Sequence, residues 1–150
     1  MDLLLWRHAE AVDSIPDNLR ELTDRGHKQA RKVAKWLDEN RPKRLRVMVS
    51  PTMRTRQTAA AFTDDFEIIT ALSPMHGVSD ILAATGWPEG RGAVLVVGHQ
   101  PTLGRLASLL LSGEENYWSV KKGALWWFTN RVRNDETQTV LRTVVSPDLL

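Results

Sequence analysis

Three short apolar runs stand out along the chain, and each is followed by a segment with helical periodicity. The runs are residues 3–6, 47–49 and 93–97. Each run is partly β-branched and apolar on both faces, which is typical of strands buried in a parallel sheet. Residues 66–69 predict another short strand. The C-terminal part predicts two more, at residues 123–129 and 139–145, around a polar loop at residues 130–138.

The helical segments each carry one apolar stripe, whose residues recur every three or four positions. The stripes are formed by Ala30, Val33, Ala34 and Leu37, by Met53, Gln57, Ala60 and Ala61 after Pro51, and by Leu103, Leu106, Ala107, Leu110 and Leu111 after Pro101. The first stripe predicts a helix over about residues 23–39. A weaker pattern predicts another helix near residues 78–84.

Strands that alternate with helices predict the fold class, which is an α/β three-layer α/β/α sandwich with a mainly parallel central sheet. We expect one domain over residues 1–150, because no repeat, low-complexity segment or long linker divides the chain. The pattern leaves the strand order open.

Composition narrows the classes of function. The formal net charge of +2 does not favour a nucleic-acid partner, although it permits local pockets for anions. The chain has no cysteine, which excludes disulfides, thiolate nucleophiles and Cys-based metal sites. The run at residues 3–6 is too short for a signal peptide, and no stretch approaches the ~18 apolar residues of a membrane span. We therefore expect a cytoplasmic protein that does not bind membranes.

A short polar turn joins each of the three apolar runs to its helix. Arg7 and His8 end the first run, Arg54 follows the second, and His99 follows the third. Taken singly, each residue has a bland interpretation as surface charge or a core histidine. In open α/β sheets, however, the carboxyl ends of parallel strands lie on one rim, where ligands bind. We therefore expect these four side chains to converge.

The expected pocket is suited to an anion. Ser50 and Pro51 predict a helix N-cap followed by proline at the first helical position, and Pro101 after Gln100 predicts the same placement of proline. Helix N-termini present free N–H groups and partial positive charge. Arginine captures phosphate oxygens in a bidentate manner. A phosphoryl group is the ligand that this combination favours.

The other histidines and a metal site are weaker interpretations. His27 lies in the polar start of a helix, where a structural role is expected, and His76 lies in a loop near the predicted pocket. No histidine or carboxylate at metal-ligand spacing accompanies His8 or His99, and neighbouring arginines repel a divalent cation. We therefore expect no metal and no cofactor.

Three motifs occur in order along the chain. They are Leu-Leu-Leu-Trp-Arg-His-Ala at residues 3–9, Ser-Pro-Thr-Met-Arg-Thr-Arg-Gln-Thr-Ala at residues 50–59, and Val-Val-Gly-His-Gln-Pro at residues 96–101. Together they resemble the RHG, SPxxRxxQTA and GH signatures of the histidine phosphatase superfamily, also called phosphoglycerate-mutase-like. Residues 20–26 and 145–147 look similar to its SixA-like branch of bacterial phosphohistidine phosphatases. The resemblance covers nearly the whole chain.

The resemblance implies a catalytic role for each matching position. His8 would be the nucleophile that takes up the phosphoryl group. Arg7, Arg54 and His99 would bind the phosphoryl oxygens and stabilise the transition state. Arg20 stands where this branch often has an arginine near the pocket, so it is a further candidate for substrate binding. The implied activity is that of a metal-independent phosphatase.

The chain departs from the family pattern in two places. The glycine of RHG is Ala9, and the general-acid glutamate of the L-x-E segment in larger members is replaced by Pro74. Proline cannot donate a proton, and alkoxide leaving groups need protonation. Glu10, Asp13 and Asp17 are possible substitutes for the missing acid. This departure favours a phosphohistidine substrate, whose P–N bond is more activated.

Three function classes follow from this interpretation. The leading one is a phosphatase that acts on a phosphorylated protein such as a phosphotransfer domain. The alternative is a small-molecule phosphatase of the same superfamily acting on a phosphate ester. The third is a non-catalytic phospho-recognition module, which is disfavoured because the nucleophile and its charged partners are all present. We expect a monomer.

Overall fold

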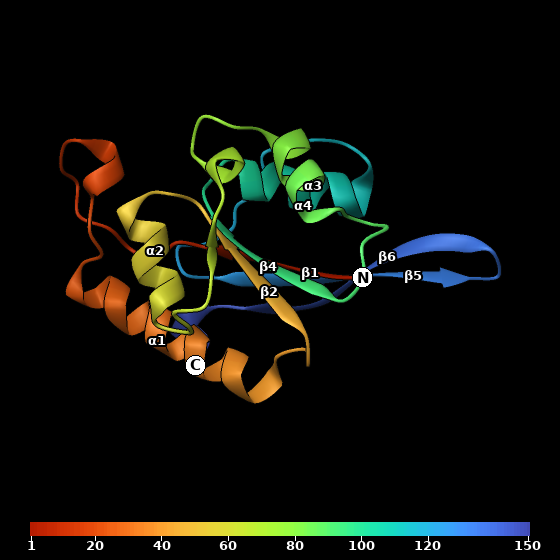
Figure 1. Ribbon diagram of the computed structural model, residues 1–150, viewed down its shortest axis with the longest axis horizontal. Helices are drawn as coiled ribbons and strands as arrows, with labels where there is room; N and C mark the ends of the chain where they lie inside the picture. The colour runs from red at the N-terminus through yellow and green to blue at the C-terminus, as the bar shows by residue number, and fades with distance from the viewer.

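A six-stranded sheet runs through the middle of the molecule, which a computed structural model describes over residues 1–150 (Figure 1). The strands are β1 (Asp2–Arg7), β2 (Leu45–Val49), β3 (Glu67–Ile68), β4 (Ala93–Gly98), β5 (Leu125–Arg133) and β6 (Glu136–Val145). Their order across the sheet is β3-β2-β4-β1-β5-β6. β3, β2, β4 and β1 pair in parallel, whereas β5 pairs antiparallel with β1 and with β6. The mainly parallel sheet is confirmed.

Three-layer packing explains why the central strands are apolar on both faces. In β1, Leu3 and Leu5 enter the core on one face, and Leu4 and Trp6 enter it on the other. All four side chains are fully buried. Each face has its own cluster of 15 buried hydrophobic residues. The predicted three-layer α/β/α sandwich is therefore confirmed.

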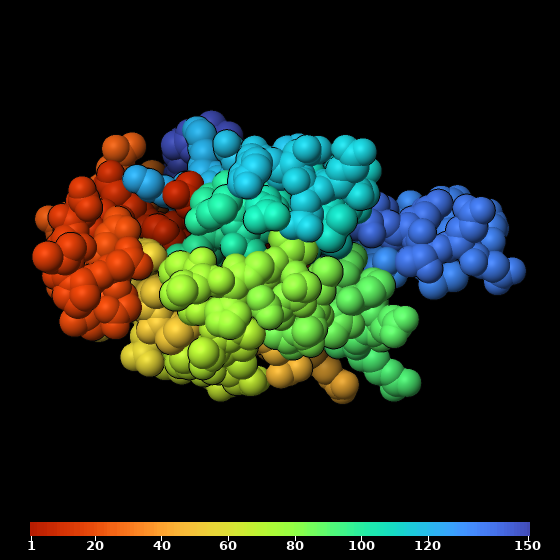
Figure 2. All heavy atoms as spheres, turned by 90° about the horizontal axis from the view of Figure 1, so that it is seen from above, coloured from red at the N-terminus to blue at the C-terminus, as the bar shows by residue number.

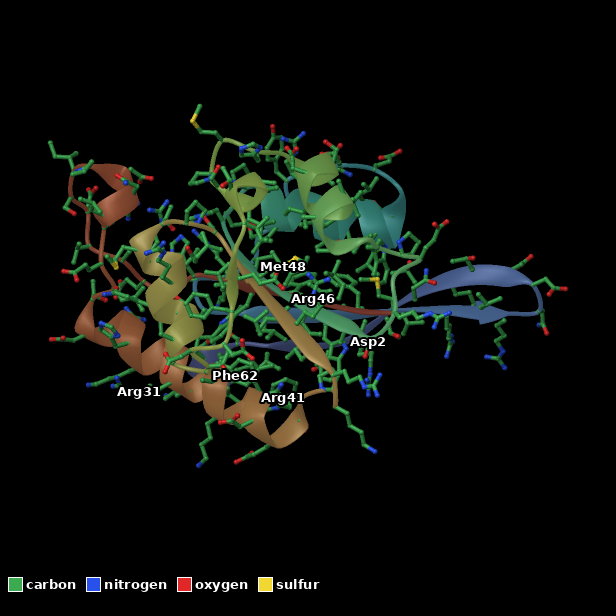
Figure 3. All side chains as sticks on the ribbon, viewed as in Figure 1. Asp2, Arg31, Arg41, Arg46, Met48 and Phe62 are labelled. Carbon is green, nitrogen blue, oxygen red and sulfur yellow. The ribbon has the colours of Figure 1, made fainter.

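Four α-helices and two short 3₁₀ helices lie between the strands, and a third 3₁₀ helix follows the last strand. They are α1 (Asp24–Asn40), α2 (Met53–Ala60), α3 (Val78–Thr85), α4 (Thr102–Ser112), η1 (Asp17–Leu19), η2 (Thr70–Leu72) and η3 (Pro147–Leu149). α1 and α2 cover one face of the sheet, and α3 and α4 cover the other (Figure 1). In Figure 3, Met48 lies toward α3 and α4, whereas Phe62 and Arg41 lie in the layer of α1. None of the helices is long and apolar enough to cross a bilayer.

Helix α1 has the stripe that its sequence predicts, and a polar cap starts it. The side-chain oxygen of Thr23 accepts a hydrogen bond from the backbone N–H of Gly26 at 3.0 Å, which satisfies one of the free donors of the first turn. The buried face of the helix includes the whole predicted stripe, which is Ala30, Val33, Ala34 and Leu37.

The first turn of α1 also holds the loop that follows β1. The hydroxyl of Thr23 donates to the Glu10 carboxylate at 2.8 Å, and the Thr23 backbone N–H donates to the Glu10 carbonyl at 3.0 Å. Gly26 lies so close to this loop that a Cβ atom there would overlap the Glu10 carbonyl oxygen. The segment that comes directly after His8 is therefore anchored on α1.

Helix α2 differs from its prediction in both its start and its buried face. It begins at Met53 with Thr52 as the N-cap residue, so Ser50 is not the N-cap and Pro51 is not the first helical residue. The predicted stripe of Met53, Gln57, Ala60 and Ala61 is wrong, because the buried residues are Arg54, Thr55, Thr58 and Ala59. The two threonine hydroxyls donate to the carbonyls of Ser50 and Arg54, both at 2.7 Å, which removes the penalty for burying them.

Helix α4 follows its prediction more closely. Pro101 is its N-cap residue and not its first helical residue, so the predicted placement of proline is again one position off. The buried face consists of Leu103, Gly104, Leu106, Ala107 and Ser108. Leu111, which belongs to the predicted stripe, is exposed, because the stripe continues beyond the region where the helix is covered.

The C-terminal strands are longer than predicted and form a hairpin that projects from the molecule (Figure 2, blue, at the right). The predicted polar loop at residues 130–138 is wrong, since pairing continues to Arg133 opposite Glu136. The turn consists of Asn134 and Asp135 alone, with φ angles of 54° and 61°. A two-residue turn with positive φ at both positions matches the twist of a hairpin, and Asn and Asp tolerate this conformation.

Candidate active site

The ends of three parallel strands bring together the polar turns at one rim of the sheet. The backbone N–H of His8 donates to the Gly98 carbonyl at 3.1 Å, and that of Ser50 donates to the Val97 carbonyl at 3.1 Å. β4 thus carries the turns of β1 and β2 on either side of its own end. The rings of His8 and His99 face each other with centroids 5.4 Å apart.

The orientation of the His8 ring determines which nitrogen can react. Its Nδ1 lies 2.7 Å from the Ala9 carbonyl oxygen, which can only accept a hydrogen bond. Nδ1 therefore carries the proton of the neutral ring, and Nε2 keeps its lone pair. The backbone N–H of Ala9 donates to the Thr58 hydroxyl at 3.1 Å. Helix α2 therefore holds the backbone of Ala9, and the Ala9 carbonyl in turn orients the His8 ring. This arrangement leaves Nε2 as the nucleophilic atom.

His8 is neutral at physiological pH. Burial lowers the pKa of His8 to about 4, since a charged ring loses its hydration there. The hydrogen bond to Ala9 opposes this shift, and the nearby guanidinium groups of Arg54 and Arg7 reinforce it. A neutral imidazole is the form that can attack an electrophile, so the surroundings keep His8 ready to react.

His99 lies against Ser50 and has one nitrogen free. Its Nε2 is 2.8 Å from the Ser50 hydroxyl oxygen, whereas its buried Nδ1 has no hydrogen-bond partner. Burial and the neighbouring His8 lower the pKa of His99 to about 3. An anion placed between the two rings favours the charged form and raises this pKa. His99 can therefore act as a hydrogen-bond donor to an anionic ligand.

Arg7 is positioned by the segment before β5. Its Nη1 donates to the Val120 carbonyl at 2.9 Å, and its backbone N–H donates to the Ala124 carbonyl at 3.0 Å. The backbone N–H of Gly123 donates to the His8 carbonyl at 3.1 Å. Residues 120–124 therefore form a second support for the strand end. The Arg7 Nε is buried and has no partner.

Arg54 is buried at the start of α2 and faces η1. Its Nη1 donates to the Asp17 carbonyl at 2.8 Å, and its Nη2 lies 3.1 Å from the Asp17 carboxylate. Arg20 reaches the same carboxylate with its Nη1 at 3.3 Å and donates from Nε to the Val12 carbonyl at 2.7 Å. Asp17 thus bridges two guanidinium groups at the rim, and Arg20 stands at the outer edge of the pocket.

The three candidate general acids, Asp17, Glu10 and Asp13, lie in different surroundings. Burial raises the pKa of Asp17, but Arg54 and Arg20 outweigh this and hold it below the ordinary range, which keeps the carboxylate ionised. The Glu10 carboxylate is bound to the Thr23 hydroxyl at the start of α1. Asp13 is exposed in the loop before η1. An ionised or distant carboxylate is a poor proton donor.

The other two histidines, His76 and His27, do not belong to the pair of rings formed by His8 and His99. The Nδ1 of His76 is 3.4 Å from the Asp80 carboxylate at the start of α3. His76 borders a cavity of about 10 Å³, the space of roughly one water, that His99 also lines. His27 lies in the first turns of α1.

Unpartnered donors mark the pocket as a place for an anion. Five buried side-chain nitrogens lack a hydrogen-bond partner, and three of them are Arg7 Nε, Arg54 Nε and His99 Nδ1. Buried donors normally have partners, so three of them on residues close to His8 point to a ligand with several acceptor oxygens. A phosphoryl group has such oxygens. No group of three His, Cys, Asp or Glu side chains has the geometry to hold a metal ion.

Two positioning residues, Ser50 and Thr58, are not among the site residues proposed from the sequence. The Ser50 hydroxyl contacts His99, and the Thr58 hydroxyl holds the backbone of Ala9. Both residues belong to the second motif, at residues 50–59, and this membership could have identified them. For Ser50, the sequence was interpreted more simply as a helix N-cap. The carbonyl of Val120 has no signal in the sequence, because any residue supplies a carbonyl.

Comparisons with known proteins agree with this geometry. The profile of the histidine phosphatase superfamily (branch 1) matches residues 3–77. The phosphohistidine phosphatase SixA of Escherichia coli (strain K12) is 32% identical over 123 residues, which cover 76% of each chain. An uncharacterized protein of Picosynechococcus is 30% identical over 136 residues, covering 83% of this chain and 82% of the relative. The solved structure of the protein histidine phosphatase SixA complexed with tungstate superposes with a TM-score of 0.82 at 27% identity, covering 99% of both chains.

Proposed function

Because this chain belongs to the histidine phosphatase superfamily, we propose that it is a phosphohistidine phosphatase that removes the phosphoryl group from a phosphorylated protein. The observation that carries the proposal is the state of His8. Its Nε2 has a free lone pair, its ring lies next to that of His99, and the charges of Arg7 and Arg54 act on it. Each of these three neighbours has a buried nitrogen without a hydrogen-bond partner. A reactive imidazole within a cationic pocket is suited to accept a phosphoryl group.

The first step transfers the phosphoryl group to the protein. The Nε2 lone pair of His8 attacks phosphorus, a new P–N bond forms, and the bond to the leaving group breaks on the opposite side. Negative charge on the three equatorial oxygens is stabilised by Arg7, Arg54 and His99. The hydrogen bond from Nδ1 to Ala9 stabilises the positive charge that develops on the attacking ring.

The second step returns His8 to its starting state. A water molecule attacks the phosphorus of phospho-His8, the P–Nε2 bond breaks, and inorganic phosphate leaves. The same donors stabilise the charge in this step, since the phosphoryl group is again the reacting centre. The chain needs no second nucleophile, and we propose that it works without a metal ion or cofactor.

The nature of the leaving group favours phosphohistidine. The position of the family's acidic residue is occupied by Pro74, and the carboxylate of Asp17 is held ionised by arginines. An alkoxide leaving group needs a positioned acid. A phosphohistidine ring that carries a proton on its other nitrogen leaves as neutral imidazole, so the proton comes with the substrate and no acid of the enzyme is needed. The SixA relative in Escherichia coli is named a phosphohistidine phosphatase. A small phosphate ester remains the second candidate substrate.

The proposal also covers the role of Arg20, the oligomeric state and the cellular compartment. We propose that Arg20 binds the incoming substrate from the rim, supported by its hydrogen bonds to Val12 and Asp17 next to Arg54. We further propose that the protein acts as a monomer in the cytoplasm, with every site residue supplied by one chain.

Trapping the intermediate tests this function. With a ³²P-phosphohistidine protein as substrate, rapid quenching into alkali should recover label on the wild-type chain, because phosphohistidine survives alkali. His8→Ala should show no label and should lower kcat/KM by at least about 10³-fold. His27→Ala, on α1, is the matched control and should retain both. Near wild-type turnover by His8→Ala would overturn the proposal.

A further inference from the structure

A groove of about 380 Å³ lies beside the mouth of the phosphoryl pocket. Its walls come from three segments: Asp17 and Asn18 of η1, Pro51 and Thr52 before α2, and residues 73–75 after η2. Figure 2 shows these segments next to one another, with the start of α2 (gold) between the loop around η1 (orange) and the loop after η2 (yellow-green). We call this feature the rim groove.

Two residues of the rim groove adjoin the phosphoryl pocket. Asp17 forms part of its wall and also lies 3.1 Å from the Arg54 guanidinium. Pro51 forms another part and directly follows Ser50, whose hydroxyl contacts His99. A molecule that fills the groove therefore contacts Asp17, which is bound to Arg54, and Pro51, which is joined to His99 through Ser50.

Large apolar side chains are exposed to solvent on the two loops that supply walls of this groove. Met75, which lines the groove, is 96% exposed. Ile15 is 96% exposed and Leu19 is 55% exposed, and both belong to the loop that supplies Asp17. A single exposed apolar residue needs no explanation, but three on the two loops that supply walls of one groove are characteristic of a site that binds another molecule.

The shape of the rim groove favours a protein surface as the occupant. A small-molecule site normally encloses most of its ligand, whereas this groove is open and Met75, Ile15 and Leu19 on the two neighbouring loops are exposed to solvent. His8 itself is only 7% exposed, so the phosphoryl group must arrive on a side chain that projects from its carrier. The surface around such a side chain would lie on the rim groove.

We propose that the rim groove, with Met75, Ile15 and Leu19, is the docking surface for the substrate protein. The partner presents apolar side chains beside its phosphohistidine, and these cover the exposed residues of both loops. This inference rests on the proposed phosphohistidine phosphatase function. It adds that recognition depends on residues outside the phosphoryl pocket, so docking and chemistry are separable.

The experiment compares one protein substrate with one small substrate. The probes are a panel of histidine-phosphorylated phosphotransfer domains and the free amino acid phosphohistidine. The test variant is Ile15→Asp combined with Met75→Asp. We expect its kcat/KM on the best domain of the panel to fall at least tenfold, mainly through a higher KM, while kcat/KM on free phosphohistidine stays unchanged. Met75→Leu should behave as the wild type does.

Val132→Asp is the matched control, because Val132 is 71% exposed at the far end of the molecule on the hairpin. It should leave both activities unchanged. The inference is overturned if the double variant keeps its activity on the domain, if it loses both activities equally, or if the wild type hydrolyses free phosphohistidine as efficiently as every domain. Failure of the wild type to hydrolyse any of these substrates would instead overturn the proposed function.

Discussion

Helices α1 and α2 lie in the same layer over the same face of the sheet, yet they contribute in opposite ways. α1 buries four apolar residues and is capped by its own threonine. α2 buries an arginine and two threonines, and its polar groups are bound to backbone carbonyls. One helix stabilises the fold, and the other positions the chemistry. The difference shows that burial alone does not reveal what a helix does.

The two helices also hold opposite sides of the nucleophile. Thr58 of α2 binds the backbone N–H of Ala9, and the first turn of α1 binds the backbone of Glu10. The loop after His8 is therefore fixed between a helix that is rich in apolar contacts and one that is rich in hydrogen bonds. Variants on each helix should separate these contributions.

Among variants of the two helices, the largest effect is expected from Arg54→Met on α2. Methionine keeps the apolar stem but loses the charge that stabilises the phosphoryl oxygens, so kcat/KM should fall about 10²–10³-fold. The free energy of unfolding should fall by only about 1–2 kcal/mol, since methionine fills the space of the arginine stem but cannot replace its hydrogen bonds to Asp17. Steady-state kinetics and urea denaturation measure the two quantities.

Arg56→Met is the matched control, because Arg56 lies on the exposed side of the same helix. It should leave both activity and stability unchanged. Equal losses of activity in the two variants would mean that α2 contributes general positive charge and no specific donor.

The converse is expected from Leu37→Ala on α1. Leu37 is fully buried in the core beneath the sheet, and its truncation should lower the free energy of unfolding by about 2–5 kcal/mol. The folded protein should keep its kcat/KM at 25 °C, because no contact of Leu37 reaches the pocket. Lys35→Ala, on the exposed face of α1, should change neither. A large loss of activity per folded molecule would contradict a purely structural role for α1.

A smaller effect is expected from pH on stability. The pKa of His8 is about 4 in the folded protein and near 6.5 when unfolded, so the unfolded chain binds more protons between these values. The free energy of unfolding should therefore fall as the pH drops below 6.5, by about 2 kcal/mol per histidine at pH 5. Below about pH 4, His8 is protonated in both states and should lower the free energy of unfolding no further.

His99, with its pKa near 3, should add a second contribution of the same sign. His8→Asn should remove about half of the slope of unfolding free energy against pH between 5 and 6.5. His27→Asn, on α1, is the control for loss of a histidine outside the site and should leave this slope unchanged. An unchanged slope in His8→Asn would show that the titrating groups lie elsewhere.

Much of the fold was predictable because the central strands and α1 follow simple apolar patterns. The run at residues 3–6 is buried on both sides, and the stripe that ends at Leu37 faces the sheet. α2 was not predictable in this way, since its buried face carries Thr55 and Thr58, whose hydroxyls bond to carbonyls five and four residues earlier in the chain. A search for apolar periodicity does not detect a face that is buried through such polar residues.

The convergence of the candidate site residues followed from strand ends, but their detailed contacts did not. That Arg7, His8 and His99 meet at one rim is a consequence of parallel pairing between β1 and β4. The bridge from Asp17 to Arg54 joins a 3₁₀ helix to α2 across a long separation, and no spacing rule predicts it. The hairpin turn at Asn134 was missed for a similar reason, because two adjacent turn residues were hidden in a longer polar stretch.

Gly26 limits how this protein can be stabilised by design. Glycine in a helix is an obvious target for protein engineers, since replacement by alanine ordinarily raises helix stability by about 1 kcal/mol. Here the added carbon would overlap the Glu10 carbonyl and displace the loop that carries the nucleophile. Thermostable variants must therefore come from other positions of α1, and any library that randomises this helix should leave residue 26 as glycine.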